Sequence, residues 1–278
     1  MKVIKTSIQL KVFIEELKVK NLKIGFVPTM GALHLGHLSL IGFAKKESDF
    51  TIASIFVNPT QFNNSADLDK YPRPLANDLD LLEQVGCDAV FVPDVAEMYP
   101  KDDIKWSYQV GYLDTILEGR FRAGHYLGVT QIVYKLFNLV KPDIAFFGQK
   151  DYQQYLVIKQ MIKDFNLPIN IIACPIIREE SGLALSSRNI RLSTTELQKS
   201  LVIYQSLMFL KKNFTSDHLE ELINKVQNLY KDIDGVALEY IEVREQETLK
   251  AYQNSGKAIA LVACKVGETR LIDNMMLS

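Results

Sequence analysis

Residues 22–46, LKIGFVPTMGALHLGHLSLIGFAKK, decide the fold. The apolar run 22–27 predicts a buried strand, and the spacing of apolar residues from about His37 to Lys46 predicts a helix. A loop rich in Gly and His, residues 28–37, joins the two. A strand followed by a loop and a helix is the repeating unit of parallel α/β sheets.

The same alternation continues to about residue 175. Further apolar runs predict strands at 50–57, 88–92, 144–147 and 169–173, with helices at 77–85, 128–140 and 151–165. Strands that are apolar along nearly their whole length are covered by helices on both faces of the sheet. The first part of the chain is therefore predicted to be α/β, with a Rossmann-like doubly wound parallel sheet.

The pattern changes after about residue 176. Ser193-Thr194-Thr195-Glu196 has the capping-box pattern that opens a helix. Helices are predicted at 193–210 and 217–230, and strands with a period of two at 236–243 and 257–264, with a turn at Asn254-Ser255-Gly256 between them. We expect two domains, residues 1–176 and a smaller α+β C-terminal domain of residues 177–278.

Composition excludes several classes of protein. The chain has 278 residues, and its 32 basic and 33 acidic side chains leave a net charge of -1, which argues against a nucleic-acid partner or a polybasic membrane surface. No apolar run approaches the ~18 residues that cross a bilayer, and the first residues lack a signal-peptide pattern. Cys87, Cys174 and Cys264 lie far apart in apolar stretches, which predicts buried thiols in a reducing cytoplasm and no zinc site.

The loop 28–37 is the strongest candidate site. It follows a strand, where α/β folds bind ligands, and the N-terminus of the next helix attracts phosphate. Gly31 and Gly36 allow a ligand to approach the backbone closely. His34 and His37 can both face one ligand and stabilise charge on a transferring phosphoryl group. A single His is more often structural, but two His framed by two Gly after a strand favour a site.

Polar residues also follow the predicted strand 144–147. Gly148, Gln149, Lys150 and Asp151 repeat the arrangement of a strand end, a Gly and a helix start. Lys150 can reach phosphate as a point charge, and Gln154, four residues later, would share its helix face. An ordinary solvated helix start explains this stretch equally well.

Two weaker candidates complete the set. Residues 182–189, GLALSSRN, offer consecutive hydroxyls and an Arg for phosphate oxygens, although a solvated loop is the commoner explanation. Their place near the domain boundary favours a ligand, because ligands often bind between domains. Asn58 and Gln61 follow the strand 50–57; Asn58 can cap the turn at Pro59, whereas Gln61 has no such local role.

The phosphate-binding motifs of two large enzyme classes are missing. The sequence contains no Gly-x-x-x-x-Gly-Lys-Ser/Thr and no Gly-x-Gly-x-x-Gly, which disfavours a P-loop kinase and a dehydrogenase. The residues alone therefore predict an α/β enzyme that binds a nucleoside triphosphate at a His/Gly loop.

Longer strings resemble one family closely. His34-Leu35-Gly36-His37 is similar to the His-x-Gly-His signature of nucleotidylyltransferases and class I aminoacyl-tRNA synthetases. The strings PTMGALHLGH, SIFVNPTQF, YPR, FFGQKDYQQ, GLALSSRN and RLIDN resemble the pantothenate synthetase (pantoate–β-alanine ligase) family. They follow one another in the family's order from residue 28 to 274, so the resemblance covers nearly the whole chain.

The resemblance implies a two-step ligation that uses ATP, with Mg²⁺ bound through the ATP phosphates. Pantoate and ATP would give pantoyl adenylate and pyrophosphate, and β-alanine would then displace AMP to give pantothenate. The adenylate is needed because a carboxylate is a poor acyl donor, whereas AMP is a good leaving group. A homodimer is also implied, in which residues 1–176 bind ATP and pantoate and residues 177–278 cover the active-site cleft.

The resemblance also implies roles for individual residues. His37 matches the catalytic acid, and His34 and Lys150 match residues at the phosphates. The implied ATP contacts are Met30, Gly31, Ala32, Leu33, His34, Leu35, Gly36, His37, Gly148, Gln149, Lys150, Asp151, Ile177, Leu185, Ser186, Ser187 and Arg188. Gln61 and Gln154 match the pair that holds pantoate, Gln61 also borders the β-alanine site, and Asn58 matches a secondary contact. No protein ligand to the metal is implied.

Two residues depart from the family pattern. Gln149 stands where Glu is common, and Ala123 stands where Pro is common in Arg122-Ala123-Gly124-His125. Two other functions stay open. A nucleotidylyltransferase would share the His-x-Gly-His loop but would give no reason for the pair Gln61 and Gln154. A non-enzymatic binding protein on this fold would be expected to lack His37, Lys150 or Arg188.

Overall fold

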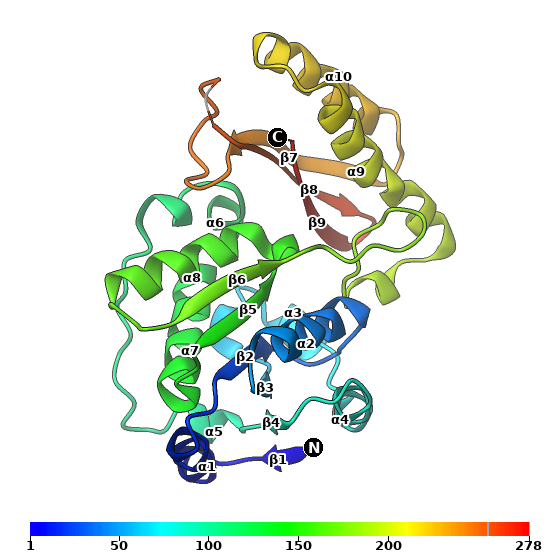
Figure 1. Cartoon of the computed structure of the whole chain (residues 1–278). Coiled ribbons are helices and arrows are strands. Elements are labelled where there is room, and N and C mark those ends of the chain that lie inside the picture. The colour runs from blue at the N-terminus through cyan, green and yellow to red at the C-terminus, as the bar shows by residue number, and fades with distance from the viewer. Residues whose placement is uncertain (255, 278) are drawn as a thin grey trace. The chain divides into compact units, whose positions relative to one another are not determined.

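The computed structural model describes residues 1–254 and 256–277 (Figure 1). Ser255, in the predicted turn, and Ser278 lie outside the described residues. Internal contacts group Met1–Gly148 with Gln153–Cys174 in a first unit, and Gln149–Tyr152 with the chain from Pro175 onward in a second. The predicted domains, residues 1–176 and 177–278, and the functions assigned to each of them stay predictions.

Within the described residues, the first unit contains a six-stranded sheet in the order β1-β4-β3-β2-β5-β6. The strands are β1 (Lys2–Ile4), β2 (Ile24–Thr29), β3 (Phe50–Ile55), β4 (Ala89–Phe91), β5 (Ile144–Gly148) and β6 (Asn170–Cys174). Every pair of neighbours is parallel. The predicted Rossmann-like parallel sheet is confirmed.

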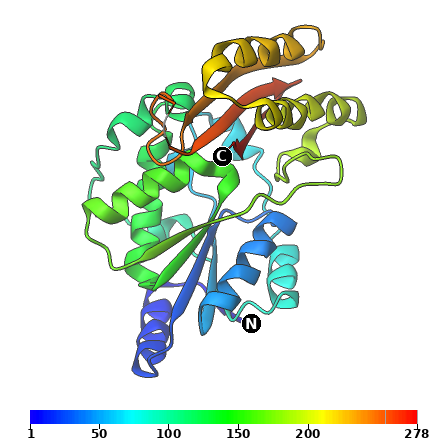
Figure 2. The ribbon, with the colours of Figure 1, turned by 45° about the horizontal axis from the view of Figure 1, so that its top comes forward.

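Helices cover both faces of this sheet, as doubly wound folds require. The longer helices are α1 (Ser7–Val19), α2 (Leu35–Glu47), α4 (Leu75–Gln84), α7 (His125–Val140) and α8 (Tyr152–Asp164). Figure 2 shows α2 and α4 on one side of the strands and α1, α7 and α8 on the other. Apolar side chains of α2 and α4 meet the sheet in one buried cluster, which includes Ile41, Leu82 and Val90. This double cover explains why the strands are apolar along almost their whole length.

Short helical turns lie in the connections of the first unit. They are the 3-10 turns η1 (Pro59–Gln61) and η2 (Gly111–Asp114), and the helices α3 (Ser65–Asp69), α5 (Val95–Met98) and α6 (Leu117–Phe121). Neither these turns nor α1 and β1 were among the predicted elements. The helices α2, α4, α7 and α8 and the strands β2 to β6 begin and end within a few residues of their predicted limits.

The neighbours of β2 position the candidate site. β2 pairs with β3 on one side and with β5 on the other, and all three run in the same direction. Parallel strands end at the same edge of a sheet, so the segments after β2, β3 and β5 all leave from one edge. Three of the four candidate stretches begin there: the loop 28–37, residues 56–62 and Gly148.

The part of the second unit that the structure describes contains a three-stranded antiparallel sheet in the order β7-β8-β9. Its elements are η3 (Gln149–Asp151), η4 (Asn189–Arg191), α9 (Thr194–Asn213), η5 (Ser216–His218), α10 (Leu219–Lys231), β7 (Val236–Glu245), β8 (Ala258–Val266) and β9 (Thr269–Met276). The predicted capping box is confirmed, because Ser193 and Glu196 each accept a hydrogen bond from the other's backbone N–H at the start of α9. The smaller α+β unit is confirmed, and β9 was not predicted.

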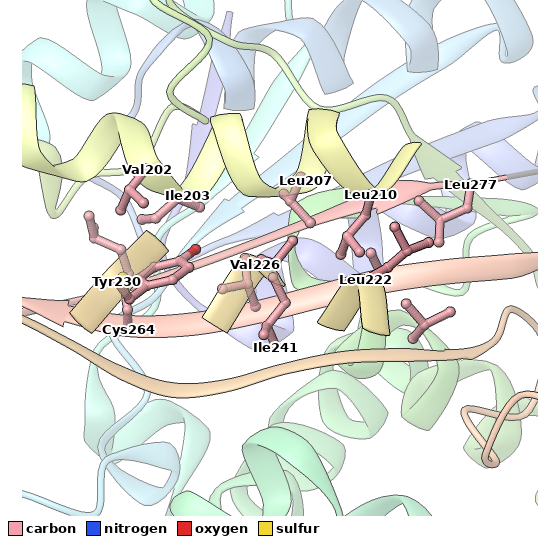
Figure 3. Close-up of a cluster of buried hydrophobic side chains, with 14 of the residues drawn as sticks. Val202, Ile203, Leu207, Leu210, Leu222, Val226, Tyr230, Ile241, Cys264 and Leu277 are labelled. Atoms are coloured by element: carbon pink, nitrogen blue, oxygen red, sulfur yellow. The ribbon is translucent and has the colours of Figure 1, made fainter. Parts of the chain in front are cut away.

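A buried apolar cluster packs the helices of the second unit onto its sheet. Figure 3 shows side chains of α9 and α10, among them Leu207 and Val226, directed toward one another beside Ile241 of β7 and Cys264 of β8. Tyr230 is buried within it, and its hydroxyl lies 2.8 Å from the Ser206 hydroxyl. That hydrogen bond satisfies two polar groups that burial would otherwise penalise.

The three cysteines are free and buried, as expected from the sequence. Burial raises the pKa of the Cys87, Cys174 and Cys264 thiols to about 12. Thiols with such pKa values carry almost no thiolate at neutral pH and react slowly. No helix among the described residues is long and apolar enough to cross a membrane.

A matched pair of glycine substitutions tests how α7 packs against η1. In Gly128→Ala, the new Cβ would lie 2.3 Å from the Thr60 carbonyl oxygen, so backbone would have to move. We expect the free energy of unfolding in denaturant titration to fall by about 1–3 kcal/mol. Gly42 in α2 has no atom within 4 Å of an added Cβ. Gly42→Ala is therefore expected to raise the same quantity by about 0.5–1 kcal/mol, and equal effects of the two substitutions would contradict this packing.

Candidate active site

The loop between β2 and α2 passes through the left-handed region of backbone conformation. Gly31 has a φ of +80° and Ala32 a φ of 51°. A Cβ on residue 31 would lie 2.9 Å from Asp78 Oδ2 and 3.0 Å from Ile55 Cγ2. Both the φ and the close neighbours require glycine at position 31.

Asp78 of α4 anchors this loop from inside the first unit. Its side chain is buried, with 1% of the residue exposed, and it accepts hydrogen bonds from the backbone N–H groups of Ala32 and Leu33, both at 2.8 Å. Burial raises the pKa of the Asp78 carboxyl, and the two N–H donors oppose that rise. Asp78 was not among the predicted site residues, because an acidic residue 45 positions from Leu33 carries no local sequence signal.

His34 and His37 close the first turn of α2. His34 is the N-cap, and its Nδ1 accepts a hydrogen bond from the Gly36 N–H at 3.1 Å. His37 Nδ1 accepts in turn from the His34 N–H at 3.4 Å, so the two imidazoles form a capping box. Because each Nδ1 is an acceptor, the neutral ring carries its proton on Nε2. The ring centroids are 4.1 Å apart, so the two imidazoles contact one another.

Gln61 lies after β3 and is held by Asn58. Asn58 Nδ2 donates to Gln61 Oε1 and to the Gly128 carbonyl, both at 3.1 Å. Asn58 Oδ1 accepts from the hydroxyl of Tyr99 at 2.6 Å, and it also caps η1. Gln61 Nε2 points to Met30 Sδ at 3.1 Å, which joins residue 61 to the loop after β2.

Tyr99 and His125 support the same turn and were not singled out by sequence. Burial raises the pKa of Tyr99 to about 12, so its hydroxyl stays protonated as the donor to Asn58. His125, at the start of α7, has Nδ1 2.8 Å from the Gln61 carbonyl oxygen. Asn63 Nδ2 donates to the carbonyl of Ala123, the residue that stands where the family commonly has Pro. The stretch 122–125 therefore also lies near η1.

The residues after β5 lie in two elements, a short turn and a helix. Gln149, Lys150 and Asp151 form the 3-10 turn η3, and α8 begins only at Tyr152. The expectation that Lys150 and Gln154 share one helix face is therefore wrong. Gln154 is partly exposed in the first turn of α8, whereas Gln153 is buried and bonds Leu113, Ile116 and Glu118.

The second unit holds the remaining predicted residues. The Leu185 N–H donates to the Ile177 carbonyl at 3.0 Å, next to a β-bridge between Arg178 and Ala184, so Ile177 and Leu185 are adjacent. Ser186 Oγ accepts from the Arg188 N–H at 3.3 Å, which bends residues 186–188 into a turn. Ser186, Ser187 and Arg188 are all partly exposed.

The structure thus assembles the predicted residues in two groups. In the first unit, the loop Met30–His37 and the turn Asn58–Gln61 lie at one sheet edge and touch through Met30 and Gln61. In the second unit, η3 packs on β9, and Ile177 pairs with Leu185.

Comparison with known proteins identifies the family. The family model for pantoate–β-alanine ligase matches residues 2–276. The chain belongs to the pantoate–β-alanine ligase family. The activity of this family is the ligation of pantoate to β-alanine, which gives pantothenate.

Individual relatives agree over their full length. The pantothenate synthetase of Cytophaga hutchinsonii is 46% identical, with 98% of each chain covered. A crystal structure of pantothenate synthetase from Thermus thermophilus has a TM-score of 0.92 at 37% identity, covering 100% of this chain and 99% of that one. The ligase of Francisella tularensis, complexed with beta-gamma ATP and beta-alanine, has a TM-score of 0.83 at 39% identity, covering 100% and 98%.

Substitutions on α4 test the anchor beneath the loop. In Asp78→Asn, an NH2 group replaces one of the two carboxylate oxygens. One backbone N–H of the loop then faces another donor in place of its acceptor. We expect the free energy of unfolding to fall by about 1–3 kcal/mol. Amide hydrogen exchange should become faster at Ala32 or Leu33, at the N–H that faces the new amide group and so loses its buried acceptor. Asp80→Asn, at an exposed position on the same helix, is the matched control and should leave both measurements unchanged. Unchanged exchange at residues 32 and 33 in Asp78→Asn would contradict the anchoring role.

Proposed function

We propose that this chain condenses (R)-pantoate with β-alanine at the expense of ATP, by way of an enzyme-bound pantoyl adenylate. Membership of the ligase family over residues 2–276 supports the reaction. The observation that carries the proposal is the pairing of His34 and His37 in the first turn of α2, because it presents two ring donors at a helix N-terminus.

The loop Met30–His37 binds the ATP phosphates in this proposal. Helix N-termini attract anions through their unpaired N–H groups and the helix dipole. The capping box holds both rings with Nε2–H as the donor. His37 donates to the phosphoryl oxygens as charge develops on them, and His34 assists it. Asp78 keeps the loop in shape for this contact, and Ala32 and Leu33 contact the nucleotide through backbone.

Gln61 and Gln154 bind pantoate. Among the residues that the structure describes, the Nε2 donor of Gln61 has one acceptor, the thioether sulfur Sδ of Met30, at 3.1 Å. Sulfur is a weak acceptor, so a pantoate hydroxyl or carboxylate oxygen would replace it with a stronger hydrogen bond. Asn58 is 1% exposed and bonded at both ends of its amide, so we assign it to hold Gln61 in place rather than to touch the substrate.

Residues 148–151 and 177–188 are assigned the remaining ATP contacts. Lys150 places its ammonium charge on the phosphates, with Gly148, Gln149 and Asp151 beside it in the sequence. Ser186, Ser187 and Arg188 hold phosphate oxygens, for which hydroxyls and a forked guanidinium are suited. Leu185 belongs to the same segment, and Ile177, whose carbonyl accepts from the Leu185 N–H, contacts the adenine side.

Mg²⁺ enters with the nucleotide. No group of three or more His, Cys, Asp or Glu side chains in residues 1–254 and 256–277 could hold a metal ion. Mg²⁺ commonly keeps most of its waters and binds through substrate phosphates, so this residue set is compatible with it. When bound, the ion would neutralise part of the phosphate charge.

The proposed chemistry needs no covalent bond to the enzyme. A pantoate carboxylate oxygen attacks the α-phosphorus of ATP, the bond to the β-phosphate oxygen breaks, and pyrophosphate leaves. The amine of β-alanine then attacks the acyl carbon, the acyl–oxygen bond to AMP breaks, and the amine loses a proton. Positioning and charge stabilisation are the main contributions that the protein makes to such transfers.

Two further properties are part of the proposal. The enzyme acts in the cytoplasm, in keeping with three buried free thiols, and without nucleic-acid or membrane partners. It forms a homodimer. Sedimentation velocity of the purified chain measures the mass of the species in solution and so tests this assignment.

Product analysis tests the reaction. The protein is mixed with Mg-ATP and pantoate, with and without β-alanine, and pyrophosphate, AMP and pantothenate are quantified. We expect sustained AMP and pantothenate only in the complete mixture, and at most one pyrophosphate per enzyme without β-alanine. Sustained pyrophosphate release without β-alanine, or a product that retains the adenylyl group, would favour a nucleotidylyltransferase.

Alanine substitutions test the assigned donors. His37→Ala and Lys150→Ala should each slow adenylate formation by roughly 10²–10³-fold, the scale for the loss of one transition-state donor. His218→Ala and Lys159→Ala remove the same side-chain types at exposed positions and should keep the full rate. Near-normal turnover in either of the first two variants removes that residue from the mechanism.

A further inference from the structure

The string RLIDN, residues 270–274 of β9, contains none of the residues that are assigned to ATP, pantoate or β-alanine. Two of its polar residues are buried: Asp273 is 3% exposed and Asn274 is 1% exposed. Buried polar groups are costly unless they are hydrogen-bonded, so their partners indicate what they do. Those partners lie in η3 and in the segment that follows Pro175.

Both the nitrogen and the oxygen of the Asn274 side-chain amide form hydrogen bonds. Its Nδ2 donates to the carbonyl oxygens of Gln149 at 2.8 Å and Lys150 at 2.9 Å. Its Oδ1 accepts from Gln149 Nε2 at 3.1 Å. Backbone carbonyls can only accept, so the orientation of the Asn274 amide is fixed, and the side chain at 149 has to donate.

Asp273 fixes the backbone from which Asn274 projects. Arg178 forms a forked ion pair with its carboxylate, with Nη2 3.0 Å from Oδ1 and Nη1 bonded to Oδ2. The same guanidinium donates to the Asn274 carbonyl at 3.1 Å and to the Gly182 carbonyl at 3.0 Å. The Asn274 N–H donates to Asp273 Oδ1 at 2.7 Å. Arg178 therefore ties β9 to the turn that leads into residues 185–188.

The turn η3 needs such an anchor. It is a 3-10 turn of three residues, Gln149–Asp151, and turns this short gain little from their own hydrogen bonds. Lys150 carries its charge on a flexible four-carbon stem, so the position of its backbone decides where the ammonium group can reach.

We propose that Asn274, held by Asp273 and Arg178, is a positioning residue that places Lys150 for the ATP phosphates. The proposal rests on the proposed function, because it assigns Lys150 to those phosphates. It also gives Gln149 a role: an amide supplies the donor that Asn274 Oδ1 faces, whereas a carboxylate in the same orientation would present a second acceptor.

Asn274→Asp tests this proposal, because it keeps the size of the side chain and removes both N–H donors. The dissociation constants of Mg-ATP and of AMP are measured by titration calorimetry on the full chain. We expect the constant for Mg-ATP to rise about tenfold, the effect of roughly 1.4 kcal/mol in a lost charge contact. The constant for AMP, which lacks the outer phosphates, should stay within about twofold of the wild-type value. Asn213→Asp changes an exposed Asn of α9 in the same unit and is the matched control.

A double substitution identifies the route. If Asn274 acts through Lys150, Asn274→Asp adds no further loss of Mg-ATP affinity in a Lys150→Ala background. Additive losses, equal weakening of AMP, or unchanged Mg-ATP affinity in a folded Asn274→Asp variant overturn the positioning role. If Lys150→Ala itself leaves Mg-ATP affinity unchanged, the assignment of Lys150 fails, and the positioning role fails with it. Should Asn274→Asp not fold, Asn274→Ser, which is neutral and keeps one donor, replaces it with the same expected pattern at smaller amplitude.

Discussion

The parallel pairing of β2 with β3 and β5 is the constraint on which the site in the first unit depends. Three neighbouring strands that run in one direction deliver three following segments to the same edge. The helix after β2 then begins at that edge, with its N-terminal N–H groups unpaired by the helix itself. A helix N-terminus suited to an anion is therefore placed at this edge by the strand order, before any side chain is considered.

Buried side chains then give these segments their shape. Asp78 accepts two backbone N–H groups of the loop after β2, and Asn58 holds Gln61. In the second unit, Asn274 donates to two carbonyls of η3. Asp78 and Asn274 each supply a segment on another element with hydrogen bonds that it lacks, whereas Asn58, the N-cap of η1, holds the Gln61 side chain within the same turn. Rigid placement of this kind is what catalysis by positioning requires.

Much of the fold was predictable because helix and strand periods are local properties of the chain. The elements that were missed show where that signal fails. β1 has only three residues, and α1 exposes Ile8, Val12 and Val19, which blurs the contrast between its faces. β9 buries Asp273 and Asn274, so its apolar alternation is interrupted by polar residues.

The sequence by itself determined the α/β alternation, the His-x-Gly-His loop and the family, because the residues concerned are adjacent in the chain. Only the tertiary structure decided which residues hold that loop and η3. Asp78 lies 45 residues from Leu33, and Asn274 lies 124 residues from Lys150. A hydrogen bond between such distant residues depends on where two elements pack, and no local pattern of side chains records it.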